Sequence, residues 1–149
     1  MFAALENLDL VVALRRSVWA YPVISWLHII GIGLLFGSIA VVDLHLLGLM
    51  RKLDGHAVRH ALVPVAIAGF WLAAVTGLLL FAPAAREYLA SPFFRLKLVL
   101  LLLAGGNTTL LRVLDRRGTW RQAAGAVCGL VSLTLWMAVI FAGRMLAFG

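Results

Sequence analysis

Residues 21–50 read YPVISWLHIIGIGLLFGSIAVVDLHLLGLM, and this stretch decides the fold class. It overlaps residues 17–42, a run of 26 residues without a formal charge. A helix needs about 20 predominantly apolar residues to cross the hydrocarbon core of a bilayer. Residues 21–50 are therefore predicted to form a membrane-spanning helix.

The composition of the whole chain agrees with this prediction. Of 149 residues, 64% are hydrophobic and only 13% are charged, which is too apolar for a soluble domain of this size. The net charge of +7 does not indicate a nucleic-acid partner, because the Lys and Arg residues lie between long apolar runs. The one cysteine, Cys128, excludes an internal disulfide and a cysteine-based metal cluster. We expect residues 1–149 to be a single integral membrane domain.

Three more apolar runs predict spans at residues 61–82, 93–113 and 122–146. Residues 2–16 place apolar side chains on one helical stripe, which predicts an interfacial amphipathic helix. The predicted fold is an all-α membrane protein, a four-transmembrane-helix bundle with an N-terminal interfacial amphipathic helix. Asp54-Gly55 indicates a turn, Pro64 should lie in the first turn of the second span, and the short connector at 83–92 predicts that the second and third spans are antiparallel neighbours.

Small residues recur at spacing four in three of the spans. They are Gly33 and Gly37, then Gly69, Ala73 and Gly77, then Gly125 and Gly129. Such spacing lets helix backbones approach closely. Because Gly33 and Gly37 point nearly opposite to His28, the first span should meet protein on two sides. We expect the bilayer and either a homodimer or a larger membrane complex as partners.

The basic residues predict an orientation. The two connectors on one side hold seven cations: Arg51, Lys52, Arg59, Arg112, Arg116, Arg117 and Arg121. The other side holds four, Arg15, Arg16, Arg86 and Arg144, with Arg95 and Lys97 left out as membrane-embedded. The positive-inside rule then predicts that both termini lie outside the cytoplasm.

His28 is the first candidate site residue, because an ionisable group inside a span is costly. It should lie roughly 10 Å below the outer end of its helix. Lys97 and Met137 should lie near the same depth, with Arg95 and Arg144 above them. A histidine, a second ligand and cations for the propionates would suit a b-type haem. The alternative is a histidine that donates one hydrogen bond between helices while the cations reach the headgroups.

A second group of candidates lies toward the opposite side. Asp43, His45, His56 and His60 fall within 18 residues, and His56 and His60 share a face if their connector is helical. Imidazoles and a carboxylate are ligands for Zn or Cu, so we hypothesise a metal site here. Asp43 lies about 60° around the helix from His28, so both could face one interior groove.

The chain also resembles known membrane proteins. The segments WLHII in the first span, RHALVP before the second and RLKLVL opening the third resemble small bacterial four-helix proteins, including HemJ-type protoporphyrinogen oxidases and CopD-like copper-handling domains. The pattern around YPVISWLHIIGIGLLFGSIAVVDL is most similar to an uncharacterised inner-membrane family. The resemblance implies a bacterial inner membrane, and the orientation predicted from the basic residues would then place both termini in the periplasm. It also implies haem association, with His28 and Lys97 matching the histidine and lysine of the HemJ-type proteins.

The chain departs from the HemJ-type pattern near the end of the third span, where it has Asn107 and Thr108 in place of another histidine. Haem association is therefore carried over as an expectation and the oxidase activity is not. Three function classes follow: a haem protein acting in redox or porphyrin chemistry, a non-catalytic accessory or structural subunit of a membrane assembly, and a copper- or zinc-handling protein.

Overall fold

The computed structural model describes residues 17–50, 52–116 and 122–146. Every secondary-structure element of the described residues is a helix. In chain order the elements are α3 (Ala20–Leu46), α4 (Gly55–Phe81), η1 (Ala82–Ala84), α5 (Ala85–Ala90), α6 (Pro92–Arg116) and α7 (Gln122–Met145). Four of these helices are long and apolar enough to cross a membrane. The prediction of an all-helical chain with four helices that could each span a membrane is confirmed for the described residues. The predicted interfacial helix at residues 2–16 lies outside the described residues.

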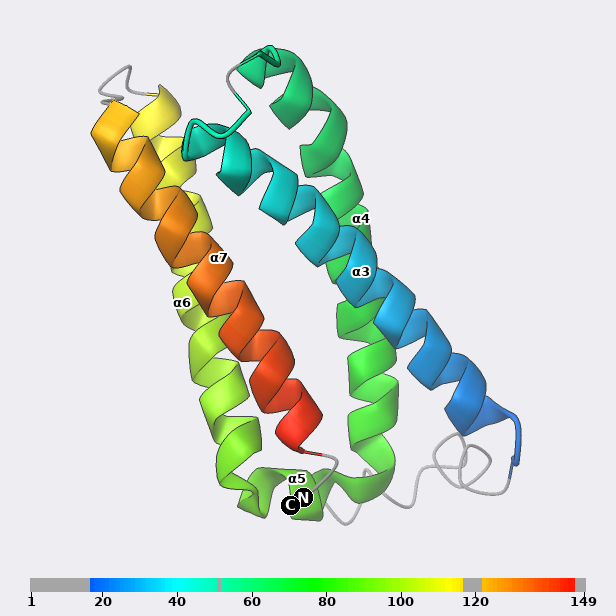
Figure 1. Cartoon of the computed structure of the whole chain (residues 1–149). Helices are drawn as coiled ribbons and strands as arrows, with labels where there is room; N and C mark the ends of the chain where they lie inside the picture. Colours follow the sequence, from blue (N-terminus) through cyan, green and yellow to red (C-terminus); the bar gives the residue numbers. More distant parts are fainter. Residues whose placement is uncertain (1–16, 51, 117–121, 147–149) are drawn as a thin grey trace.

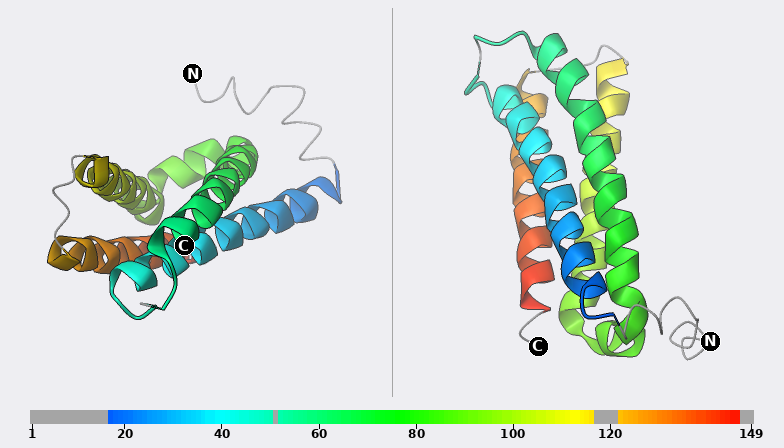
Figure 2. Two further views of the ribbon diagram at one scale, coloured as in Figure 1. Left: turned by 90° about the horizontal axis from the view of Figure 1, so that it is seen from above. Right: turned by 90° about the vertical axis from the view of Figure 1, so that its right-hand side faces the viewer.

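The four long helices form two antiparallel hairpins (Figure 1). The α3–α4 interface is the most extensive, followed by α6–α7, and α3–α7 joins the two hairpins. We predicted that α4 and α6 would pack as neighbours, but this pair does not form one of these interfaces among the described residues. The reason is the connector, which folds into η1 and α5 and runs sideways at the foot of the bundle, so α4 and α6 stand apart (Figures 1 and 2).

Both ends of the α3–α4 connection differ from the prediction. The helix α3 ends at Leu46 and not at residue 50, because Gly48 takes a positive φ of 80° that stops the helix, with its N–H donating to the carbonyl of His45. The helix α4 begins at Gly55 and not at residue 61. The carboxylate of Asp54 accepts hydrogen bonds from the backbone N–H groups of His56 and Ala57, at 3.0 and 3.4 Å, and so caps the earlier start. Pro64 therefore lies inside α4 and not in its first turn.

Glycines set the closeness of α3 and α4. A Cβ on Gly31 would lie 2.6 Å from the backbone nitrogen of Ala73, and a Cβ on Gly69 would lie 2.6 Å from that of Leu35. The two backbones are therefore in contact, as the Gly69 spacing predicted. By contrast, Gly33 and Gly37 have nothing within 4 Å of an added Cβ. The expected partner on that face of α3 stays a prediction.

The interior of the bundle is small and its outside is apolar. The buried hydrophobic cluster contains Leu35, Ala66, Ala104, Trp136 and Val139. Many large apolar side chains point outward, among them Leu102, which is 77% exposed, and Trp71, which is 62% exposed. An outward apolar surface on all four helices is what lipid requires, since lipid tails are as apolar as leucine.

Candidate functional site

His28 lies on α3 and is bonded to α4. Its Nδ1 is 3.1 Å from Oγ1 of Thr76, a residue that is only 3% exposed. The Thr76 hydroxyl donates its one proton to the carbonyl of Leu72, at 2.6 Å, so the hydroxyl oxygen accepts from His28. In a neutral ring this fixes the proton on Nδ1 and leaves the lone pair on Nε2. His28 thus makes the interhelical hydrogen bond of the alternative interpretation, and it also hydrogen-bonds to the backbone of Ala73 on the same helix α4.

The space for the His28 ring comes from a glycine of α4. A Cβ on Gly77 would lie 3.0 Å from Cε1 of His28, which is tighter than ordinary contact. The small-residue row that brings α3 and α4 together therefore also accommodates the imidazole. Thr76 and Gly77, which were not singled out as site residues, are the two residues that hold His28 in place.

Lys97 comes to the same end of the bundle from the other hairpin. It is half-buried on α6, with its Nζ 3.3 Å from the position of a Cβ on Gly143 of α7, and it lies within electrostatic range of His28. Its side chain is thus directed against α7 and not out to lipid. Among the sequence-predicted residues, Lys97 is the one that the structure brings toward His28.

The other three residues proposed around His28 lie differently. Met137 is 62% exposed on the outer face of α7, so it does not share a ligand position with His28. Arg95 is exposed and donates a hydrogen bond to the carbonyl of Ala90 at 3.3 Å. Arg144 is exposed in the last turn of α7, at the same end of the bundle as Arg95.

The four residues of the hypothesised metal site have separate surroundings. Asp43 is 2% exposed and faces the bundle interior. The Nδ1 of His45 donates to the carbonyl of Met50 at 3.1 Å, and its ring packs against Gly55. His56 and His60 are exposed on α4 with stacked rings 6.1 Å apart, as a helical connector predicted. Within the described part of the chain, no group of three or more His, Cys, Asp or Glu residues could hold a metal ion.

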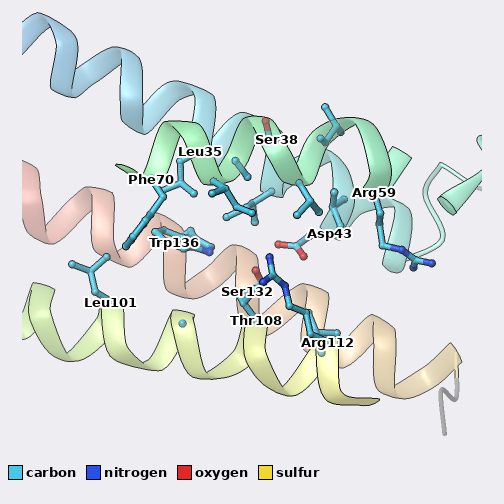
Figure 3. A pocket seen from close by; sticks show the side chains of 18 of the residues that line it. Leu35, Ser38, Asp43, Arg59, Phe70, Leu101, Thr108, Arg112, Ser132 and Trp136 are labelled. Carbon is cyan, nitrogen blue, oxygen red and sulfur yellow. The ribbon is translucent and has the colours of Figure 1, made fainter. Parts of the chain in front are cut away.

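A cavity of about 650 Å³ lies between the two hairpins, toward the end of the bundle that carries Asp43 (Figure 3). Side chains from all four long helices line it. Its walls are mostly apolar, and they include Leu35, Ile67, Phe70 and Leu101. The cavity exists because α4 and α6 do not close against each other.

The polar residues of this cavity gather around Asp43. Ser132 of α7, which is 3% exposed, hydrogen-bonds to the Asp43 carboxylate. In the part of the chain that the structure describes, the other carboxylate oxygen, Oδ2, is buried without a hydrogen-bond partner, and so is the indole Nε1 of Trp136. The side chain of Arg112 extends from α6 toward Asp43, whereas that of Arg59 points away toward the end of the bundle (Figure 3).

Several of these cavity residues were missed by sequence reasoning. Asp43 was considered as a metal ligand, but Ser132, Trp136 and Arg112 were not considered as site residues. Trp136 offered one usable signal: it lies in the middle of a predicted span, whereas tryptophans of membrane proteins concentrate at the two interfaces. Serine and threonine inside spans give a weaker signal, because most of them bond to their own helix, as Thr134 does with Leu130.

The bundle has no detected counterpart among known proteins: no family model, no curated protein and no solved structure matches the chain. The resemblance to HemJ-type and CopD-like proteins therefore stays an expectation from the sequence.

Proposed function

We propose that this chain is a multi-pass protein of a bacterial inner membrane that binds a b-type haem at the His28 end of the bundle. The observation that carries the proposal is the hydrogen bond from Nδ1 of His28 to Thr76. Metal-ligating histidines almost always donate their second ring N–H to a fixed acceptor, which orients the ring and sets the tautomer. His28 has that arrangement, with Nε2 as the ligating atom.

Some of the residues around His28 fit a b-type haem, and one does not. Lys97 of the opposite hairpin would be the second ligand, and Arg95 and Arg144, at the same end of the bundle, would be the cations for the propionates. Met137 does not fit, because it faces outward. A bound haem would supply one-electron redox chemistry, which the protein tunes through its axial ligands and the polarity around them. In this chain His28 binds, Thr76 orients the ring and Gly77 leaves room for it.

A visible absorption spectrum of protein expressed with ample haem tests the proposal. We expect a Soret band that is lost in His28→Ala and kept in the matched control His60→Ala, which removes an exposed imidazole from α4. In Thr76→Val, which keeps the shape but removes the acceptor, the band should remain and the reduction potential should change. Far-UV circular dichroism checks that each variant is folded.

Two results would overturn this proposal. A Soret band that survives in folded His28→Ala shows that the ligand assignment is wrong. The absence of any Soret band in the wild-type protein removes haem and leaves an accessory role in a larger membrane assembly, which a pull-down in mild detergent then examines.

The orientation is part of the same proposal. The C-terminal ends of α3 and α6 and the N-terminal ends of α4 and α7 lie at one end of the bundle (Figure 1). The two sequence segments that join these ends carry seven cations against four in the segments of the other side, and this excess supports a cytoplasmic location for that end. A reporter fused after Gly149 should therefore report a periplasmic location, and one inserted between residues 112 and 121 a cytoplasmic one. The reverse pattern would contradict the orientation.

A further inference from the structure

The cavity at the Asp43 end holds two polar atoms with nothing to bond to. Asp43 is 2% exposed and Trp136 is 6% exposed, and among the described residues neither Oδ2 of Asp43 nor Nε1 of Trp136 has a hydrogen-bond partner. Buried polar groups in folded proteins are almost always hydrogen-bonded, and each exception calls for an explanation. Here an unmatched acceptor and an unmatched donor lie at the same cavity (Figure 3).

The position of this polar pair is fixed by packing. A Cβ on Gly129 of α7 would lie 3.1 Å from the carbonyl oxygen of Asp43, so α7 and α3 are in close contact at this level. Ser132 holds one side of the carboxylate, and Trp136 follows one helical turn later on the same face of α7. The two unmatched atoms therefore belong to side chains of a packed α3–α7 interface and not of a loop.

The rest of the cavity is suited to an apolar body. Its volume of about 650 Å³ lies within the range of small-molecule sites, which are mostly apolar with a few placed polar groups. Leucine and phenylalanine side chains of α4 and α6 form the walls on the side where these two helices stand apart. Because the outer surfaces of α4 and α6 are apolar as well, a molecule dissolved in lipid can enter between them.

Charged groups of both signs line the cavity, so a head group with a net charge of either sign would be repelled by one of them. A cationic head would meet Arg112, which extends toward Asp43, and Arg59 beyond it. An anionic head would meet the buried carboxylate of Asp43 itself. A hydroxyl avoids both repulsions, and it is the smallest group that can donate to Oδ2 of Asp43 and accept from Nε1 of Trp136.

We propose that the cavity binds a membrane-soluble amphiphile with an uncharged hydroxyl head, a long-chain alcohol or phenol, whose hydroxyl pairs with Asp43 and Trp136 while its apolar body lies between α4 and α6. This site is independent of haem binding, because none of the residues proposed around His28 lines the cavity. The ligand enters from the lipid and not from water.

Quenching of Trp136 fluorescence by 2-bromoundecan-1-ol, which carries its bromine beside the hydroxyl that the proposal places at Trp136, tests the proposal. The reporter is the full-length protein in nanodiscs with Trp19, Trp26, Trp71 and Trp120 replaced by Phe, so that the signal comes from Trp136 alone. We expect saturable quenching at Trp136. A second protein that keeps only Trp71, which is 62% exposed on α4, should show non-saturating quenching by probe dissolved in the bilayer. Three further probes carry the same apolar body with a different head. Bromoundecane has no head group, bromoundecanoate has an anionic head and bromoundecyltrimethylammonium has a cationic head.

Two variants test the binding of the head group and of the apolar body of the ligand separately. Asp43→Asn replaces one of the two carboxylate oxygens, either the unmatched Oδ2 or the other, by an amide N–H donor. It should weaken bromoundecanol binding about tenfold, the equivalent of one lost hydrogen bond to a charged group. Its matched control is Asp54→Asn, on an exposed helix cap. Gly105→Phe fills the cavity from α6, where an added Cβ meets nothing within 4 Å, and should abolish saturation. Its control is Gly106→Phe, which is equally open but does not line the cavity.

Each remaining outcome contradicts the proposal. Equal saturation by bromoundecane means that the cavity takes any acyl chain, and tighter binding of the anionic or cationic probe means that the head-group assignment is wrong. Non-saturating quenching at Trp136, or unchanged quenching in Gly105→Phe, means that there is no site. If Asp43→Asn does not fold, the Gly105 and Gly106 pair decides between a site and no site, and the four probes decide the head group.

Discussion

The α3–α4 interface and the α4–α6 side of the bundle use glycine in opposite ways. Between α3 and α4, Gly31 and Gly69 let two backbones touch, and an added Cβ would come within 3 Å of backbone atoms. On α6, Gly105 and Gly106 meet nothing, and Gly105 opens onto the cavity. One side of the protein is closed by backbone contact, and the other is left open at the cavity. The polar residues around His28 lie at the closed α3–α4 interface, and those around Asp43 lie at the open cavity, so the position of both clusters depends on this difference.

The first test is to disturb the closed side. Gly69→Ala should destabilise the protein by about 2 kcal/mol or more, because the new methyl group meets the backbone nitrogen of Leu35 and the carbonyl of Gly31, neither of which can rotate away. Unfolding by SDS in mixed micelles, followed by circular dichroism, measures the change. Gly33→Ala on the open face of α3 is the matched control and should be neutral or slightly stabilising. Equal stability of the two variants would mean that α3 and α4 are not in backbone contact.

The second test makes the same change on the open side, where we expect the smaller effect and the opposite sign. Gly105→Ala should raise stability by about 0.5–1 kcal/mol, because alanine loses less conformational entropy in a helix and its methyl group meets no other atom. The same SDS titration measures it. A loss as large as that of Gly69→Ala would show that α6 is closed against a neighbour at this point.

The spacing of small residues predicted the contact face of α4 correctly and that of α3 wrongly. The spacing of Gly69, Ala73 and Gly77 predicted close approach, and the structure has it at Gly69 and uses Gly77 to accommodate His28. The same argument selected Gly33 and Gly37, which meet no described residue, and it passed over Gly31, which touches α4. Residues two apart on a helix point about 200° apart, so Gly31 and Gly33 lie on nearly opposite faces, and choosing the wrong glycine of the two selects the wrong face of the helix.

The candidate site residues show the same limit: the sequence selects a residue but does not say toward which helix its side chain points. The cost of placing an ionisable group inside a span was enough to select His28 and Asp43. The suggestion that both face one groove was too simple, because His28 bonds to α4 through Thr76, whereas Asp43 bonds to α7 through Ser132. Met137 was selected by depth alone, and depth does not say which way a side chain points around its helix.

The sequence by itself determined that this chain forms four long apolar helices, because uncharged runs of this length can satisfy their backbone only as helices in a bilayer. It also determined where α3 stops and α4 starts, through the local chemistry of Gly48 and Asp54, although we placed both boundaries wrongly. Only the tertiary structure decided the rotation of each helix about its axis, and with it the partner of His28, the burial of Asp43 and the opening between α4 and α6. Helix rotation is set by packing against neighbours that lie far away in the sequence, so local sequence patterns leave it undetermined.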